Sequence, residues 1–116
     1  MDNKKYNSLK GGIAEKIAKA HLEKNNYKIK CSNFKSNVGE IDIIAYDQEI
    51  LVFVEVKYRS NNVFGLPREA VGVEKQRKIR MVAMSYIKKY KLFDTPCRFD
   101  VLEILGDKIT LIKDAF

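Results

Sequence analysis

The chain has 116 residues, with 22 Lys and Arg against 15 Asp and Glu, which gives a formal net charge of +7. This length suits a single domain over residues 1–116 with a real core, and leaves no room for a second domain. The excess of basic over acidic residues favours a polyanionic partner, either a nucleic acid or an anionic membrane surface. Because no signal peptide and no run of about 18 apolar residues is found, we expect a cytoplasmic protein that does not bind a membrane.

The first predicted element is a helix that is capped by Asn7 or Ser8 and ends at about Asn25. Apolar residues recur in it at helical spacing, namely Leu9, Ile13, Ala14, Ile17, Ala18 and Leu22. Glu15 falls at the border of this stripe, so we expect its carboxylate to reach over a sheet edge. His21 falls inside the stripe, where a hydrogen-bonded core histidine is expected rather than a catalytic one.

Three strands are predicted next. Residues 27–33 alternate apolar and polar side chains, as an edge strand should. After a turn at residues 37–39, the runs 39–46 and 50–57 are rich in β-branched and aromatic residues. The intervening residues 47–49 have the length and polarity of a hairpin turn. Both runs are apolar on both faces, which predicts a central, buried, antiparallel hairpin.

Four charged residues interrupt this hairpin near its strand ends. Side chains alternate across a strand, so Glu40 and Asp42 share one face of the first strand. Glu55 and Lys57 share one face of the second strand for the same reason. Charges in such surroundings are costly unless they are paired or bound to metal. They are therefore the first indication of a functional site.

A polar segment at residues 58–69 reads as a long loop that could contact a substrate. The second helix is predicted from Val73 to about Lys91, and its inner stripe consists of Ile79, Val82, Ala83, Tyr86 and Ile87. Lys75 lies one turn before Ile79, so it should point toward the sheet. The helix carries seven basic residues against the single acid Glu74, and they are Lys75, Arg77, Lys78, Arg80, Lys88, Lys89 and Lys91. A solvated face explains this charge as readily as a binding surface does.

Two more strands are predicted at residues 97–105 and 108–113, joined by a turn at Gly106 and Asp107. Phe116 should pack its ring against the sheet. The predicted order is α-β-β-β-α-β-β, which is typical of an α/β domain with a central mixed sheet flanked by helices.

The charged cluster suits phosphodiester hydrolysis. Asp42 and Glu55 are the carboxylates that could hold Mg²⁺ or Mn²⁺, which stabilises charge on the phosphoryl oxygens. Lys57 could orient the attacking water and offset the developing charge. Glu15 and Glu40 could complete the metal shell directly or through water. Each residue alone is more often part of a surface ion pair, but the combination favours a nuclease-type site over a structural ion-pair cluster.

Three segments together resemble the YraN-like family of small, largely uncharacterised bacterial proteins. They are Gly39-Glu40-Ile41-Asp42, Phe53-Val54-Glu55-Val56-Lys57 with Arg59, and Arg98-Phe99-Asp100-Val101. That family resembles the PD-(D/E)xK nuclease superfamily, and within it the archaeal Holliday-junction resolvases. The resemblance covers nearly the whole chain and implies a restriction-endonuclease-like core, divalent metal and a homodimer that acts on branched DNA.

Carried over by position, Asp42 resembles the motif aspartate, Glu55 its second acid and Lys57 its lysine. Glu15 resembles the first-helix glutamate of the resolvases, and Lys75 looks like an auxiliary residue of the second helix. The proline that names the motif is absent, because Glu40-Ile41 precedes Asp42. The motif in this chain is therefore shorter and less specific.

We therefore expect a metal-dependent endonuclease that acts on nucleic acid, with DNA favoured and branched or structured DNA implied by the resemblance. The residues expected to contact nucleic acid are Arg59, Lys75, Arg77, Lys78 and the segment 58–69. One alternative is a non-catalytic nucleic-acid-binding module with the same fold. Another is a basic interaction protein whose charged cluster is purely structural.

Overall fold

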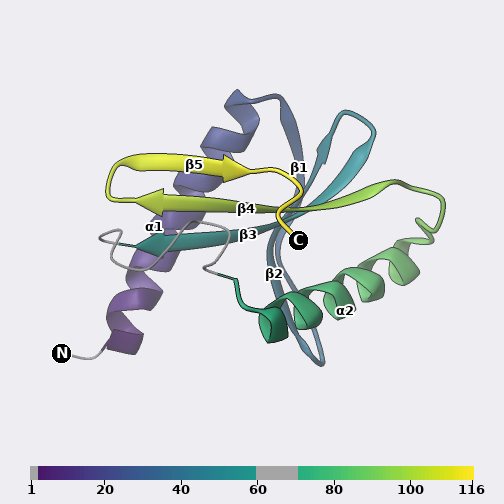
Figure 1. Cartoon of the computed structure of the whole chain (residues 1–116), viewed down its shortest axis with the longest axis horizontal. Helices are drawn as coiled ribbons and strands as arrows, with labels where there is room; N and C mark the ends of the chain where they lie inside the picture. Colours follow the sequence, from purple (N-terminus) through teal and green to yellow (C-terminus); the bar gives the residue numbers. More distant parts are fainter. Residues whose placement is uncertain (1–2, 60–70) are drawn as a thin grey trace.

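The computed structural model describes the backbone of residues 3–59 and 71–116, with side chains from residue 12 onward. Within these ranges the elements are α1 (Asn3–Lys24), β1 (Tyr27–Ser36), β2 (Gly39–Asp47), β3 (Ile50–Arg59), α2 (Val73–Tyr90), β4 (Cys97–Leu105) and β5 (Lys108–Ile112) (Figure 1). This confirms the α/β class and the predicted order of elements. Neither helix in the described residues is long and apolar enough to cross a bilayer.

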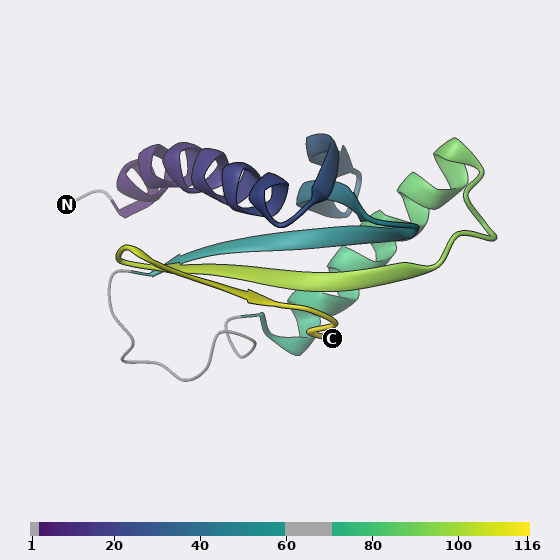
Figure 2. The ribbon, with the colours of Figure 1, turned by 90° about the horizontal axis from the view of Figure 1, so that it is seen from above.

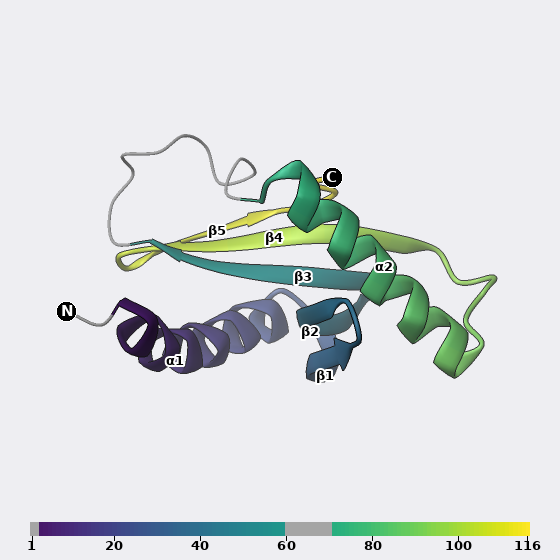
Figure 3. The ribbon, with the colours of Figure 1, turned by 90° about the horizontal axis from the view of Figure 1, so that it is seen from below.

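The five strands form one mixed sheet in the order β1-β2-β3-β4-β5. Three neighbouring pairs are antiparallel, and β3 pairs with β4 in parallel. A parallel pair needs a crossover connection, and the segment between β3 and β4 contains α2. Helix α1 covers one face of the sheet and α2 covers the other (Figures 2 and 3). The predicted sheet with flanking helices is therefore confirmed.

Each face of the sheet has its own apolar core. On the α1 face, Ala14, Ala18 and Leu22 pack against strand residues such as Val54 and Leu102. On the α2 face, the buried residues of the helix are Ile79, Val82, Ala83 and Tyr86, which confirms the predicted inner stripe. The interior strands β2, β3 and β4 bury side chains on both faces, as their apolar sequences require.

The prediction for α1 was wrong in two respects. The helix begins at Asn3 rather than after a cap at Asn7 or Ser8, because residues 3–8 contain no proline or glycine that would stop it. Its buried stripe is also narrower than expected. Ile13 is 61% exposed and Ile17 is 37% exposed, because the helix contacts the sheet through the alanines at positions 14 and 18.

The remaining boundaries differ by a few residues. Strand β3 runs through Arg59, so Tyr58 and Arg59 belong to the sheet and not to the predicted loop. The rest of that loop, residues 60–69, lies outside the described residues. Strand β1 is longer than predicted and contains a register shift between Ile29 and Cys31. The terminal Phe116 stacks on Phe99 with ring centroids 5.2 Å apart, which confirms that it packs on the sheet.

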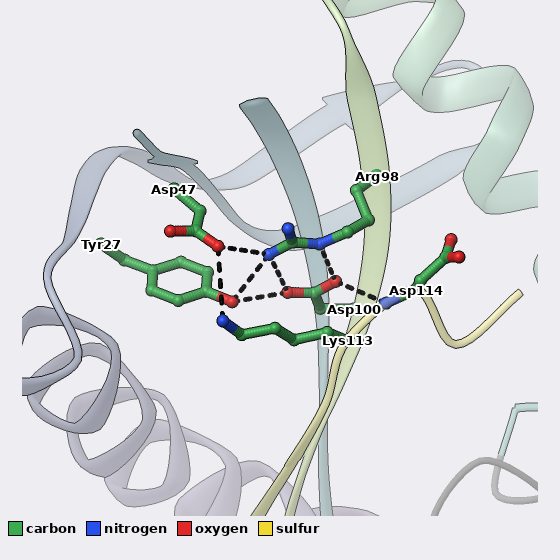
Figure 4. Close-up of polar contacts among 6 residues, drawn as sticks. All are labelled: Tyr27, Asp47, Arg98, Asp100, Lys113 and Asp114. Carbon is green, nitrogen blue, oxygen red and sulfur yellow. Dashed lines mark hydrogen bonds and ion pairs between the residues drawn. The ribbon is translucent and has the colours of Figure 1, made fainter. Parts of the chain in front are cut away.

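A buried polar network on the α1 side joins strands that are distant in sequence (Figure 4). Its centre is Asp100 of β4, whose side chain is fully buried. Arg98 donates to it from Nε to Oδ1 (2.8 Å) and from Nη2 to Oδ2 (3.0 Å). The Tyr27 hydroxyl donates to the same Oδ2 (2.8 Å), and Arg98 also reaches Asp47 Oδ2 at 2.9 Å. These bonds connect β1, β2 and β4.

The chain that follows β5 closes the same network, which we call the Asp100 network. The backbone N–H of Asp114 donates to Asp100 Oδ1 (3.0 Å), and Lys113 Nζ lies 3.5 Å from Asp47 Oδ2. Hydrogen bonding from Arg98 holds the pKa of Asp47 below its usual range. Burial, reinforced by the bond to Asp100, raises the pKa of Tyr27 above its usual range. A buried charge with this many partners stabilises the fold only while the set is complete.

We expect Asp100→Ala to lower the free energy of unfolding by about 3–5 kcal/mol, because it leaves the Arg98 guanidinium without its main partner. Tyr27→Phe removes two hydrogen bonds to charged groups, the one donated to Asp100 and the one accepted from Arg98, and should cost at least about 1.5–3 kcal/mol. Urea unfolding followed by circular dichroism measures both changes. Asp107→Ala, in the exposed β4–β5 turn, is the control and should change stability by less than about 0.5 kcal/mol. Equal effects at positions 100 and 107 would contradict this role.

Candidate functional site

The candidate site lies where β2 and β3 separate. Their ladder runs from the turn to the pair Ile43 and Val54. Beyond that pair β2 continues with β1 alone, while β3 continues with β4 as far as Arg59. The β1–β2 hairpin therefore bends away from β3 and runs beside α2 (Figure 1). Beyond the separation, the N–H and C=O groups on the β2 side of β3 have no strand to pair with, while the other edge of β3 stays paired with β4.

Asp42 takes over one of these backbone groups. The N–H of Val56 donates to Asp42 Oδ2 at 2.8 Å, in place of a carbonyl of the ladder. The Asp42 carboxyl also shares a hydrogen bond with Glu55, the residue before Val56. Glu55 is only 6% exposed, and strand alternation turns it toward α2 together with Phe53. Two carboxyl groups are thus held side by side in largely buried surroundings.

This arrangement changes the proton affinity of Asp42. Burial, followed by the hydrogen bond and the charge of Glu55, raises the pKa of Asp42 to about 8. The bond from Val56 and the charge of Lys75 oppose this shift without cancelling it. At neutral pH the Asp42 carboxyl is therefore protonated, and its O–H can donate a hydrogen bond to Glu55. Two adjacent carboxylates cannot both ionise without a compensating cation.

Lys75 of α2 supplies one positive charge. Its Nζ lies 3.3 Å from Glu55 Oε2, which confirms that Lys75 points toward the sheet. The distance is that of an ion pair, but the two groups are not aligned as a hydrogen bond, and Glu55 Oε2 is buried without a hydrogen-bond partner. The Lys75 side chain is 51% exposed, so solvent can replace it at the carboxylate.

The pair opens into a hollow of about 380 Å³, which we call the acidic hollow. It is lined by Val38, Gly39, Glu40, Asp42, Glu55, Lys75, Lys78 and Ile79. The structure thus brings the predicted site residues Glu40, Asp42, Glu55, Lys75 and Lys78 together around one hollow, and their roles stay predictions. The sequence prediction missed the β1–β2 turn residues Val38 and Gly39, which form one wall. No chemical signal in the sequence marks these two residues, because their place depends on how the hairpin bends.

The residues present fit a divalent cation. Mg²⁺ is bound through one or two carboxylates and keeps several waters. Asp42 and Glu55 offer such a pair, and Glu55 Oε2 is ion-paired with Lys75 but accepts no hydrogen bond. Among the side chains of residues 12–59 and 71–116, no group of three Asp, Glu, His or Cys is placed to hold a metal. A cation here would be coordinated by two carboxylates and by water.

Glu15 is engaged elsewhere, at the edge of the sheet. The Nδ2 of Asn33 donates to Glu15 Oε2 at 2.9 Å, and Lys19 Nζ lies 3.1 Å from Oε1. Glu15 belongs to α1, whose packing face covers the opposite side of the sheet from α2. The predicted reach over the sheet edge thus ends at Asn33. A contact of Glu15 with a bound metal stays a prediction, and so does a water-mediated contact of Glu40.

Lys57 and Arg59 continue along β3 on the same face as Glu55. Lys57 is half-buried, does not line the acidic hollow, and has no hydrogen bond or ion pair with the described residues. Arg59 is paired with buried Glu103 of β4, from Nε to Oε2 and from Nη2 to Oε1, both at 2.9 Å. This pairing gives Arg59 a structural role, and its contact with nucleic acid stays a prediction.

Glu103 was missed from the sequence, although a signal was present. It is a lone acid in the apolar run 101–105, which is the same pattern that singled out Glu55 in β3. On the basic helix, Lys78 faces the acidic hollow, whereas Arg77 points outward and pairs with Glu74 at 2.6 Å. The basic residues of α2 thus divide between the site and an exposed surface.

Comparison with known proteins places the chain in one group. The sequence model of "Uncharacterised protein family UPF0102" matches residues 14–104. A UPF0102 protein of Clostridium beijerinckii is 49% identical over 97% of this chain and 97% of its own length. A UPF0102 protein of Clostridioides difficile is 46% identical over 95% and 98% of the two chains, and one of Acetivibrio thermocellus is 42% identical over 100% and 97%. The similarity therefore spans the whole fold.

We expect Asp42→Asn to stabilise the protein relative to wild type at pH 9, and to do so by a much smaller amount at pH 5. The folded pKa of Asp42, about 8, lies above its unfolded value of 3.8. Wild-type stability should therefore fall as pH rises from about 4 to 8, by at most about 1.4 kcal/mol per pH unit. The asparagine amide mimics the protonated carboxyl and removes this fall.

Urea unfolding at both pH values measures the effect, with Glu49→Gln in the exposed β2–β3 turn as the control. Equal loss of stability in Asp42→Asn at pH 5 and pH 9 would show that the two carboxyls do not share a proton.

Proposed function

The chain belongs to the uncharacterised protein family UPF0102, and for this member we propose the function of a metal-dependent endonuclease that hydrolyses phosphodiesters of nucleic acid. The observation that carries the proposal is the hydrogen-bonded pair of half-buried Asp42 and buried Glu55 at the mouth of a lysine-lined hollow. Such a pair is costly to build. A cation-binding role would explain why the chain carries this costly pair, whereas a purely structural role would not.

We assign Mg²⁺ or Mn²⁺ to Asp42 and Glu55 as the resident cofactor. Bound there, the ion would supply charge stabilisation at the phosphoryl oxygens and a more acidic water. The chain's own contribution is to hold the two carboxylates in place. The backbone of Val56 fixes Asp42, and burial in β3 fixes Glu55. Because the raised pKa keeps Asp42 protonated, a cation held there would require Asp42 to lose its proton, so cation affinity should rise with pH.

The lysines take separate roles in this proposal. Lys57 follows Glu55 on the same strand face and has no competing partner in the described residues, so it can orient the attacking water or offset charge on the phosphate. Lys75 and Lys78 line the hollow and attract the phosphate backbone. Lys75, now 3.3 Å from Glu55, would be free to pair with a phosphate if a cation were held by the carboxylates.

The fold adds support. A mixed five-stranded sheet between two helices, in the order α-β-β-β-α-β-β, is what a resemblance to the PD-(D/E)xK superfamily implies. The positions of Asp42, Glu55 and Lys57 on the two central strands agree with the motif of that superfamily. DNA is the substrate that the resemblance favours. A homodimer would place two such sites on the two strands of a branched DNA.

One observation favours a second candidate, a non-catalytic nucleic-acid-binding module. Lys75 Nζ already lies 3.3 Å from Glu55, so a cation of the chain itself occupies part of the place that a metal would take. If this ion pair persists in solution, the carboxylates stay neutralised and the basic surface serves binding alone. The two candidates differ in whether the pair Asp42 and Glu55 is needed for more than stability.

A cleavage assay on labelled single-stranded, duplex, flap and four-way-junction DNA, with Mg²⁺ or Mn²⁺, tests the first candidate. Wild type should cut at least one of these substrates. Asp42→Asn and Lys57→Met should each lower the rate by about 100-fold or more while the protein stays folded. Glu49→Gln, an acid lost at a distance from the site, should cut like wild type. Binding of all substrates without cleavage by any protein would favour the binding module, and loss of cleavage in Glu49→Gln would contradict the assignment of the site.

A further inference from the structure

A second hollow lies beside the acidic one, and we propose that it holds an unpaired base of the bound nucleic acid. Its volume is about 580 Å³, and it lies between the β1–β2 turn and α2. Its lining consists of Ser36, Asn37, Val38, Met81, Met84, Ser85 and Lys88, and we call it the methionine hollow. The proposal rests on the nucleic-acid-binding part of the proposed function and does not require cleavage.

The two hollows form a continuous path along one side of α2. Val38 lines both of them. The α2 residues that line them include Lys75, Lys78, Met81, Ser85 and Lys88. Their spacings of three and four residues place them along one side of the helix. At 1.5 Å per residue the path from Lys78 to Lys88 is about 15 Å long, so it spans a few nucleotides and has a lysine at each end.

The middle of this path is apolar and open to solvent. Met81 is 42% exposed, Met84 is 48% exposed and Val38 is 40% exposed. Methionine side chains are polarizable and adapt their shape to flat aromatic surfaces. The face of a nucleobase is such a surface, and its contact with protein side chains contributes to the binding of single strands. Phosphate groups, by contrast, gain nothing from apolar neighbours.

The rim of the methionine hollow is polar, as the edge of a base requires. Ser36 Oγ accepts a hydrogen bond from the Val38 N–H (3.3 Å), so its hydroxyl proton remains to be donated. Asn37 is exposed in the turn and offers both a donor and an acceptor. Ser85 Oγ donates to the Met81 carbonyl (3.3 Å) and keeps its lone pairs. An apolar floor with a polar rim matches a base better than it matches a phosphate.

The base must be unpaired to use this hollow. In a duplex the faces of the bases are covered by stacking, and only their edges and the backbone reach a protein. The net charge of +7 and the lysines at both ends favour a polyanion over an apolar peptide. The structure therefore assigns a substrate class, which is nucleic acid with an unpaired nucleotide next to the phosphate at the acidic hollow. Single strands and flaps belong to this class, whereas duplexes and fully paired four-way junctions do not.

Methyl NMR of protein labelled at methionine tests this directly. The chain has three methionines, Met1, Met81 and Met84, so Met1 serves as an internal reference. Titration with a 12-nucleotide single-stranded DNA should shift the methyl signals of Met81 and Met84, because a stacked base imposes its ring current on them. An abasic strand of the same length carries the phosphates without bases and should leave both signals in place. Equal shifts with the abasic strand would overturn the proposal.

Binding measurements on variants complete the test. Met81→Ser combined with Met84→Ser should weaken binding of the single strand by roughly tenfold, with duplex affinity unchanged within twofold. Ile13→Ser, an exposed apolar residue of α1 on the other side of the sheet, is the matched control and should bind both like wild type. Equal weakening for single strand and duplex would overturn the base contact, and so would no weakening at all.

The outcomes separate this inference from the proposed function. If wild type binds single strands and duplex equally and both methionine signals stay fixed, the methionine hollow is not a base site, while nucleic-acid binding stands. If wild type binds no nucleic acid at all, the proposed function and this inference fall together. If the methionine variant instead converts a dimer to a monomer in sedimentation without changing DNA affinity, a second copy of the chain occupies the hollow and the inference is overturned.

Discussion

The structure depends on one costly arrangement, two carboxyl groups held side by side in a largely apolar sheet. Glu55 lies in the middle of β3, where its neighbours on both faces are core residues. Asp42 is fixed against it because β2 leaves β3 at that point and Asp42 bonds the Val56 N–H that the ladder no longer pairs. The acidic hollow and the acidic pair therefore both lie where the hydrogen-bond ladder between β2 and β3 ends. A shared proton, a lysine or a metal ion must then compensate the charge.

The other charged groups of the sheet secure this geometry. The Asp100 network joins β1, β2 and β4 on the α1 face, and the pair Arg59 and Glu103 joins β3 to β4 on the α2 face. In each set a buried carboxylate is paired with a guanidinium group. The acidic pair differs in its surroundings, because it opens into a hollow lined by lysines and its partner Lys75 is 51% exposed, whereas Arg59 and Arg98 are 17% and 14% exposed. Among the charged clusters of the described residues, it is the one suited to bind a ligand.

The sequence predicted the elements well because their signals are local. Alternation in β1, continuous apolar runs in β2 and β3, and the inner stripe of α2 each follow from residue spacing alone. The hairpin was also predicted, but its turn is residues 48–49 and not 47–49, because Asp47 pairs with Ile50. This register, which the predicted turn would have shifted by one residue, places Asp42 level with Glu55. Other features depend on tertiary geometry. Glu15 bonds Asn33 because of where α1 crosses the sheet edge, and the methionine hollow exists because the β1–β2 hairpin bends toward α2.

The measurement that tests the central claim most directly is a Mn²⁺ titration followed by amide NMR, since the paramagnetic ion broadens the signals of nearby residues. The account predicts that the signals of Asp42, Glu55 and Val56 disappear first at Mn²⁺ concentrations below that of the protein, and that Asp42→Asn prevents this loss. Broadening that begins at exposed acids such as Glu49 and Asp107, with the signals of β2 and β3 intact, would contradict a metal site at the pair.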